Sequence, residues 1–518
     1  MRLARACSLS FAFLSLCGCG QKADSASQAG DGAGSAGTPA SAGAANGGGA
    51  NGGSPAGSAG ISAGGARGGA GGAGGGSIGG SSGGHTPGSG GAAGGTSGSA
   101  GAATSSGGSA GASVAGGGGT SGTSASGAAG MQGMAGSPTG AHFPFPQNQR
   151  VASCTYPTAA SADDAKKAYD AWKSELVTSD GAGGHLRVQR PNSPGAEPNS
   201  TVSEGIGYGM ILAVAFDDQH TFDELWKYSQ LWLDSNGLMN WYINAAGTSV
   251  SGSGAATDGD EDMAWALVMA DRQWGGQGSL DKPYLDYAKT QIKAIWDHEI
   301  DPSNSYFLLA GDTWGGTIVF NASYFAPTEY RIFGDVSGDA TGWGHVIDTG
   351  YTILAKSLNS ASGNATNGLV PAWCDANGVP KSPPNGSATN YQYDSARIPF
   401  RIGLDYCWYG EARAKTYLPK ISQFFAGIGA SKIVDGYDLN GTPHPDPDSD
   451  PNGPQSAVFV GSAAVGAMHD ATFQSFIDDA YALVATGTLL ARSRYYNLSW
   501  TALTLAMLTG NLVEYPSR

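Results

Sequence analysis

The stretch SEGIGYGMILAVAF, residues 203–216, places one carboxylic acid, Glu204, among glycines and aromatic residues directly before an apolar run. Glycine allows a ligand to approach the backbone closely, and apolar surroundings favour the protonated form of an acid. A general acid catalyst requires that form. The alternative is a helix start at which Glu204 only balances the helix dipole. The stretch makes Glu204 a candidate general acid, and it leaves both interpretations open.

Apolar residues recur at helical spacing from residue 162 to residue 508, and strand signals are few (186–189 and 316–320). A capping box of Thr221 and Glu224 marks one helix start. About twelve helices are expected, at 162–177, 204–216, 221–234, 260–274, 284–299, 326–333, 343–358, 398–409, 417–425, 456–468, 472–484 and 498–508. This pattern predicts an all-α assembly of helical hairpins, with acids and aromatics on loops gathered at one face as a cleft.

The first 140 residues have a different character. Arg2 and Arg5 precede an apolar run that closes with Leu-Cys-Gly-Cys at 16–19, which predicts a signal peptide over residues 1–18. The ending is similar to a bacterial lipobox, with lipid on Cys19; the alternative is an ordinary signal peptidase site. Residues 19–140 are almost wholly Gly, Ala, Ser and Thr and predict a disordered linker. The folded body is expected at 141–518, outside the cytoplasm, with the membrane reached only through the anchor.

The folded body is acidic, with 23 basic and 40 acidic residues after residue 140. Such a surface repels nucleic acids and anionic lipids, so neither is expected as a partner. Cys154, Cys374 and Cys407 remain in this part. Cys407 lies in an apolar helical run and is expected in the core, so Cys154 and Cys374 are the predicted pair if a disulfide forms. No zinc-ligand spacing is present.

Two further clusters carry carboxylates. Residues 255–264, AATDGDEDMA, hold four acids at a predicted helix start, where capping and the dipole explain one or two of them. Asp258 precedes a glycine and is expected outside the helix, free to face a ligand. In YQYDSARIPFR, residues 391–401, Asp394 and Arg397 share a helical face. The guanidinium favours an ionised Asp394, as a general base requires, although a structural ion pair would look the same.

These three motifs together resemble glycoside hydrolase family 8, the former cellulase family D, over essentially all of residues 141–518. The most specific segment is ATDGDEDMAWALVMADRQW at 256–274. The resemblance implies an (α/α)6 barrel of six helical hairpins, in agreement with the helix count above. It also implies endo-acting, inverting hydrolysis of a β-1,4-linked glycan without a cofactor.

The resemblance also implies roles for individual residues. Glu204 matches the proton donor and Asp394 the base that activates water. Asp258 matches a residue that binds and distorts the sugar and that some schemes call the nucleophile. The binding role is favoured, because an inverting enzyme forms no covalent intermediate. Arg397 is expected to orient Asp394 and the water. The residues that match sugar-stacking positions of the family are Trp241, Trp314, Tyr393, Tyr495 and Tyr496.

The substrate remains open among cellulose, mixed-linkage β-glucan and xylan. Chitosan is less favoured, because chitosanases of the family often lack the aspartate that Asp394 matches. A surface glycan-binding lipoprotein without activity is the alternative of another class, and a monomer is expected. One segment, 446–453, begins like a calcium loop. It carries Pro451 where such a loop needs glycine, so no metal site is predicted.

Overall fold

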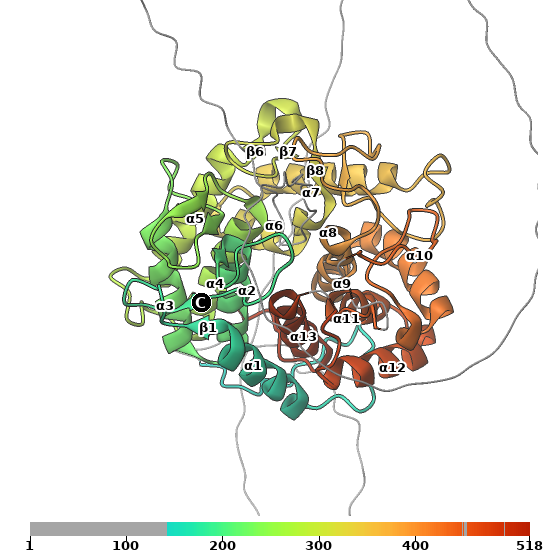
Figure 1. The fold of residues 1–518 in the computed structure, drawn as a ribbon, viewed down its shortest axis with the longest axis horizontal. Helices are drawn as coiled ribbons and strands as arrows, with labels where there is room; N and C mark the ends of the chain where they lie inside the picture. The colour runs from blue at the N-terminus through green and yellow to red at the C-terminus, as the bar shows by residue number, and fades with distance from the viewer. Residues whose placement is uncertain (1–141, 448, 450–452, 492, 518) are drawn as a thin grey trace, which may run out of the picture. The chain divides into compact units, whose positions relative to one another are not determined.

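The computed structural model describes residues 142–447, 449, 453–491 and 493–517 (Figure 1). The predicted signal peptide, Cys19, the linker and most of the 446–453 segment lie outside these residues. None of the helices in the described part combines the length and hydropathy that a membrane crossing needs.

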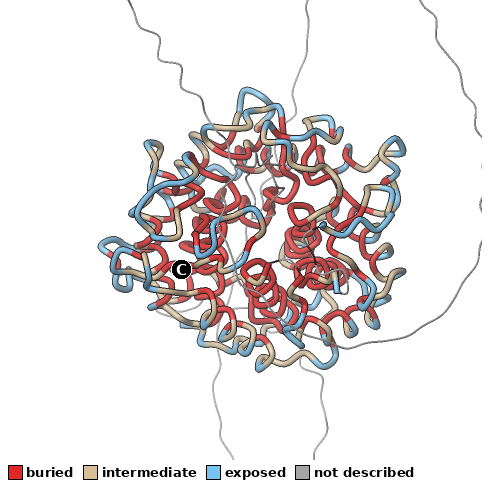
Figure 2. The backbone as a smooth tube through the Cα atoms, in the orientation of Figure 1, coloured by how far each residue is buried: buried red, intermediate tan, exposed pale blue. Residues whose placement is uncertain are grey.

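Six helices of the described chain form an inner ring (Figure 1). They are α2 (Ser203–Ala215), α4 (Thr257–Gln273), α6 (Pro327–Ser337), α9 (Ile398–Tyr409), α11 (Ala457–Ala467) and α13 (Arg494–Leu508). Each contacts the next, and α13 contacts α2, so the ring closes. Every residue of α2 and of α11 is buried, because these helices are covered on all sides (Figure 2). Burial on every side explains why the sequences of α2 and α11 are apolar around the whole helix rather than on one face.

Six outer helices cover this ring. They are α1 (Ala162–Leu176), α3 (Gln219–Ser229), α5 (Tyr284–His298), α7 (Ala340–Ser357), α10 (Ala412–Ile428) and α12 (Gln474–Ala485). Each packs on an inner helix that is its neighbour in sequence, except α1, which packs on α13 and joins the two ends of the fold. Each outer helix buries one face against the ring. The buried residues of α1, for example, are Ala165, Tyr169, Trp172 and Leu176. This is the predicted (α/α)6 barrel.

Short elements connect the helices. A four-residue helix, α8 (Tyr393–Ala396), precedes α9, and all paired strands of the described chain are antiparallel. The strands are β1 (Val177–Thr178), β2 (Arg187–Val188), β3 (Thr201–Val202), β4 (Tyr242–Ile243), β5 (Val250–Gly252), β6 (Ile300–Asp301), β7 (Phe307–Leu308), β8 (Phe320–Asn321) and β9 (Trp373–Cys374). The segment 316–320, predicted as a strand, is mostly a 3-10 turn, η3 (Gly316–Ile318).

Several predicted helix starts were wrong by three to five residues, at α4, α7, α10 and α13, and the start of α3 by two. Two of these corrections involve capping. Helix α3 begins at Gln219, and the Asp218 side chain accepts the hydrogen bond from the Thr221 N–H, so the cap lies before the predicted capping box. Helix α4 begins at Thr257 and has no side-chain cap. Asp258 therefore lies in the first turn of α4 rather than outside the helix, and it reaches the site from there.

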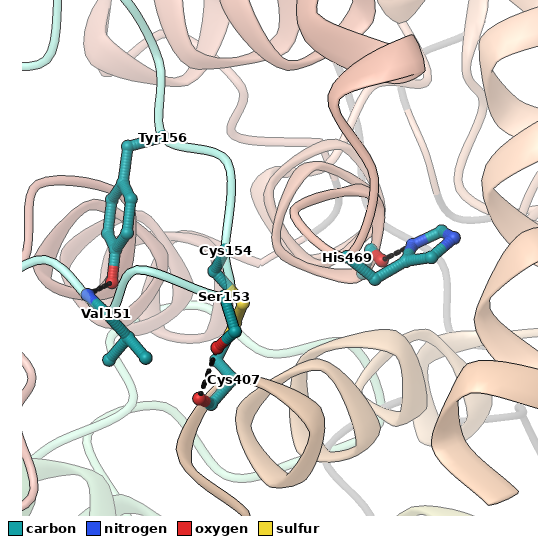
Figure 3. The surroundings of a disulfide bond; sticks show 7 residues. Val151, Ser153, Cys154, Tyr156, Cys407 and His469 are labelled. Carbon is teal, nitrogen blue, oxygen red and sulfur yellow. Dashed lines mark hydrogen bonds between the residues drawn. A yellow bond between two sulfur atoms is a disulfide. The ribbon is translucent and has the colours of Figure 1, made fainter. Parts of the chain in front are cut away.

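The disulfide joins Cys154 to Cys407, which corrects the predicted Cys154–Cys374 pair (Figure 3). Cys407 lies near the end of α9, where the segment that enters the barrel runs past it, and the Ser153 hydroxyl donates to the Cys407 carbonyl at 3.1 Å. The two Cα atoms lie 5.6 Å apart, within bridging range. Cys374 is buried in β9 as a free thiol. The helical periodicity around Cys407 could not show that this side of α9 contacts the segment around Cys154, which is distant in the sequence.

Candidate active site

Glu204 lies in the first turn of α2, with a side chain that is almost completely buried. Two glycines let α2 and α4 approach closely enough to bring Glu204 beside Asp258. A Cβ atom on Gly207 would lie 2.7 Å from the Cβ of Asp262, and one on Gly259 would lie 2.6 Å from the Ser203 hydroxyl. Larger residues would separate the helices. The glycines of the opening stretch therefore serve helix packing at this point.

Arg397 joins the three predicted catalytic carboxylates. Its Nη1 atom lies 3.0 Å from Glu204 Oε2 and 2.7 Å from Asp258 Oδ2, and Nη2 lies 3.4 Å from Asp394 Oδ1. The Arg397 side chain is fully buried, and its guanidinium lies 5.3 Å from the centre of the Tyr324 ring. Carboxylates from three motifs that are far apart in the sequence thus meet at one cation.

Asp394 is held by three donors. Its Oδ2 atom accepts from the Trp373 indole at 3.1 Å and from the Gln392 amide at 3.0 Å, and Arg397 contacts Oδ1. The same Gln392 caps helix α8 by accepting from the Asp394 backbone N–H. These donors match the acceptor-only character of a carboxylate.

Burial is the largest electrostatic influence on both Glu204 and Asp258. Burial raises the pKa of Glu204 to about 7, and Asp258 adds to the rise, against the lowering effect of Arg397. Burial also raises the pKa of Asp258, opposed by Arg397. Surrounding negative charge and the tyrosines raise the pKa of Arg397 well above its ordinary value despite burial, so it stays charged. With a pKa of about 7, a substantial fraction of Glu204 carries its proton near neutral pH, the state that a general acid requires.

Both carboxyl groups, Glu204 and Asp394, contact terminal nitrogens of one planar guanidinium. Their nearest oxygens therefore lie no more than about 9 Å apart, a limit compatible with the separation of about 6.5–9.5 Å in inverting glycosidases.

The predicted sugar-stacking residues divide into two groups. Trp241 is 7% exposed and lies against Gly252 in the β4–β5 hairpin, and Trp314 is half-buried with its indole N–H on the Ala255 carbonyl at 2.9 Å. Both lie on segments adjoining the start of α4. Tyr393 and Tyr495 are each only 1% exposed.

The buried tyrosines make polar contacts instead. Tyr495 donates to Glu204 Oε1 at 2.8 Å, Tyr393 donates to Asp435 at 2.8 Å, and Tyr496 donates to the Tyr393 carbonyl at 3.3 Å. The rings of Tyr393 and Tyr496 pack edge to face against each other. Their stacking role stays a prediction, and in this structure Tyr495 contacts the predicted catalytic carboxyl group of Glu204.

Four contacts of the site were missed by sequence reasoning. The Tyr208 hydroxyl oxygen accepts a hydrogen bond from Arg397 Nη1 at 3.1 Å. Tyr208 lies in the opening stretch, one helical turn after Glu204, and this spacing was an available signal. Gln392 lies in the motif at residues 391–401, two residues before Asp394. Trp373 and Tyr324 come from the β8–β9 region, and no local pattern distinguishes them from core aromatics.

Two of the remaining acids of the second cluster, Glu261 and Asp262, lie in a separate buried network, while Asp260 accepts from the Gln291 amide of α5 at 3.0 Å. Arg401, one turn after Arg397, contacts Asp262 at 2.7 Å and also Glu329 of α6, and Tyr330 donates to Glu261 at 2.5 Å. Helix capping therefore does not explain Glu261 and Asp262, because they tie α4 to α6 and α9. Within the described residues, no group of His, Cys, Asp or Glu side chains is placed to hold a metal ion.

Comparison with known proteins shows the family of this chain. The model of glycosyl hydrolases family 8 matches residues 143–510. Endoglucanase 2 of Ruminiclostridium josui is 43% identical over 64% of this chain and 69% of its own length. Endoglucanase A of Acetivibrio thermocellus is 40% identical over 67% of this chain and 69% of its own length.

A solved structure supports the fold as well. The apo structure of a β-1,3-1,4-glucanase from Paenibacillus sp. X4 aligns with a TM-score of 0.64 and 28% identity, over 71% of this chain and 98% of that one. The match of the family model across most of the chain, the closed double ring of helices and the cluster at Arg397 lead to one conclusion. The chain is a glycoside hydrolase and belongs to family 8 of the glycosyl hydrolases.

Proposed function

We propose that this protein cleaves internal β-1,4 bonds of glucans with inversion at the anomeric carbon. The observation that carries the proposal is the contact of one guanidinium, Arg397, with Glu204, Asp258 and Asp394. The named activities of the relatives, endoglucanases and a β-glucanase from Niallia circulans that is 30% identical over 72% of this chain, support glucan as the substrate.

In this mechanism Glu204 donates its proton to the glycosidic oxygen as the bond to the anomeric carbon breaks. A water molecule attacks that carbon from the opposite face, and Asp394 removes its proton. Asp258 binds the sugar at the cleavage point and favours its distortion. Arg397 balances the negative charge and orients Asp394. The cycle ends when Asp394 returns its proton to solvent and Glu204 regains one.

The decisive experiment is proton NMR of the first product formed from cellopentaose or barley β-glucan. Inversion predicts that the α-anomer appears first and that the β-anomer grows only by mutarotation. A β-anomer at the earliest time point would contradict the assignment of Asp394 as base. Reducing-end release on carboxymethylcellulose, β-glucan, xylan and chitosan then fixes the substrate, with Glu204→Gln as control.

A xylan-directed activity is the second candidate. A reducing-end xylose-releasing exo-oligoxylanase, Rex8A of Paenibacillus barcinonensis, is 26% identical over 60% of this chain. Cleavage of xylan alone would keep the mechanism and change the substrate. Binding without cleavage of any of the four polymers would favour a glycan-binding protein.

We also propose that the protein acts outside the cytoplasm as a lipoprotein anchored through Cys19. The Cys154–Cys407 disulfide supports an oxidising compartment, and the Leu-Cys-Gly-Cys sequence at residues 16–19 supports lipidation. Membrane fractionation of wild type and Cys19→Ser tests it. Release of the variant into the soluble fraction is the expected result, and unchanged fractionation would refute the anchor.

A further inference from the structure

An open groove of about 520 Å³ lies along the outer helix α7, and it shares no lining residue with the cluster at Arg397. One wall comes from the turn η2 (Pro302–Asn304) and strand β7, and another from the residues that follow β9. Its volume is in the range of about 300–1,000 Å³ that ligand sites commonly have. Nothing in the proposed mechanism uses it.

One face of α7 forms the length of the groove. His345, Thr349, Thr352 and Lys356 line it and are spaced by three or four residues, so they share one helical face. At the helical rise per residue this strip is about 16 Å long. A strip of this length suits an extended ligand better than a small molecule.

Aromatic rings form one end of the strip. The His345 imidazole stacks on the Tyr306 ring, with centroids 4.7 Å apart and planes at 28°. Trp296 lies behind Tyr306 at 6.1 Å. His345 is exposed, so the pair presents a ring surface to solvent. Ser305 and Tyr306 both adopt φ +57°, a conformation that costs free energy in residues other than glycine. Thr349 helps to hold this turn by donating to the Ser305 carbonyl.

The other lining groups are mostly uncharged. Asn304 and Asn377 bring amides, and Asp348 is neutralised in part by Arg413 at 2.6 Å. Amide and hydroxyl groups beside a flat ring match the neighbouring hydroxyls and apolar ring face of a pyranose. The acidic body disfavours an anionic ligand. The chemistry of the groove therefore fits a neutral polyhydroxyl chain.

The two walls of the groove are also connected to the catalytic cluster. Asn377 follows Trp373, whose indole holds Asp394, by four residues. Phe307 precedes Leu309 by two residues, and the Leu309 carbonyl accepts from Thr257, next to Asp258. The same two segments thus line the groove and reach the active site.

We propose that this groove is a second binding site for β-glucan chains, which holds the polymer while the site at Arg397 cleaves it. The proposal rests on the proposed function for the identity of the sugar. The site increases the effective concentration of polymer at the enzyme, and it has no such effect on a short oligosaccharide that the active site binds alone.

The test compares kcat/KM on barley β-glucan and on cellopentaose for wild type, His345→Ala and Tyr306→Ala. Loss of a ring-stacking contact should lower kcat/KM on the polymer about three- to tenfold and leave the value on cellopentaose unchanged. Tyr406→Ala is the matched control, because Tyr406 also pairs with a histidine ring, His469, but lies outside the groove. His345 is exposed on a helix surface, so His345→Ala keeps the test valid if Tyr306→Ala unfolds.

Affinity electrophoresis in gels that contain barley β-glucan gives a direct readout of binding. In the Glu204→Gln background, His345→Ala should reduce the retardation, and Tyr406→Ala should not. Equal kcat/KM on the polymer in wild type and both groove variants, with equal retardation, would overturn the proposal. A wild type that cleaves neither glucan would instead refute the proposed function, so the two failures are distinguishable.

Discussion

The hydroxyl group of Tyr495 donates a hydrogen bond to Glu204 Oε1 at 2.8 Å, while Arg397 contacts the other oxygen at 3.0 Å. Both contacts favour the ionised form of Glu204, and burial opposes them. The acid is therefore adjusted by a balance in which burial is the largest effect. Each side of this balance can be altered separately.

The wild-type enzyme should lose activity as the pH rises through about 7, because the pKa of Glu204 is raised to about 7 and the reaction needs its protonated form. Activity that depends on this proton is fully present below that pH and lost above it. A profile of kcat/KM against pH on cellopentaose measures the alkaline limb. A limb that falls near pH 4 to 5 would contradict the assignment of Glu204 as the acid.

Tyr495→Phe should move that limb to higher pH. The hydrogen bond from Tyr495 lowers the pKa of Glu204, so its removal raises the pKa and extends activity upward. A loss of about 0.5–1.5 kcal/mol from one hydrogen bond predicts a shift of no more than about one pH unit. Tyr496→Phe is the control, because the Tyr496 hydroxyl donates to a backbone carbonyl instead.

Arg397→Lys should lower kcat by about a hundredfold or more, because an ammonium group cannot bridge three carboxylates as the planar fork does. Arg401→Lys is the matched control: Arg401 is buried in α9, one turn after Arg397, and pairs with Asp262 and Glu329 outside the site. The control should lower Tm while the remaining folded protein keeps most of its kcat. Equal losses of kcat in both variants would mean that Arg397 has only a structural role.

Asp394→Asn should lower kcat by about 10²–10⁴-fold without a comparable change in Tm, because the amide keeps the shape of the side chain but cannot take a proton. Asp170→Asn, at an exposed pair with Lys166 on α1, is a surface control that should change neither quantity. Wild-type turnover by Asp394→Asn would require another base.

Cys154→Ser should reduce the free energy of unfolding by about 2–4 kcal/mol, because the Cys154–Cys407 bond closes a long loop of the unfolded chain. The measurement is Tm with and without reductant. Cys374→Ser should respond to reductant as wild type does, since Cys374 is a free thiol. A Tm that is insensitive to reductant in wild type would contradict the bond.

Most of the barrel could be predicted from the sequence because its inner helices are covered on all sides. The apolar run after Glu204 belongs to an inner helix that is buried on every side. An outer helix such as α1 instead has apolar residues on one face only. The helix boundaries were harder to predict from the sequence. The start of α4 depends on backbone contacts such as the Thr257 N–H to the Ala310 carbonyl at 3.3 Å, which no local pattern reveals.

The candidate catalytic residues could be predicted because each of the three acidic motifs has unusual sequence surroundings, whereas the residues that contact them could not. Trp373 is one buried tryptophan among several until the fold brings it to Asp394. The true partner of Cys154 is likewise a matter of tertiary contact, since 253 residues separate the two cysteines.

The route by which the chain enters the barrel has a mechanical consequence. Upstream of α1, the Gln149 N–H donates to the Gly510 carbonyl at 2.7 Å, and Cys154 is bonded to Cys407 at the end of α9. A force applied to the residues before 142 therefore reaches a covalent bond before it reaches the first helix. The force is therefore transmitted to the inner helix α9 through the disulfide, and α1 is not the first element to be pulled away from the barrel.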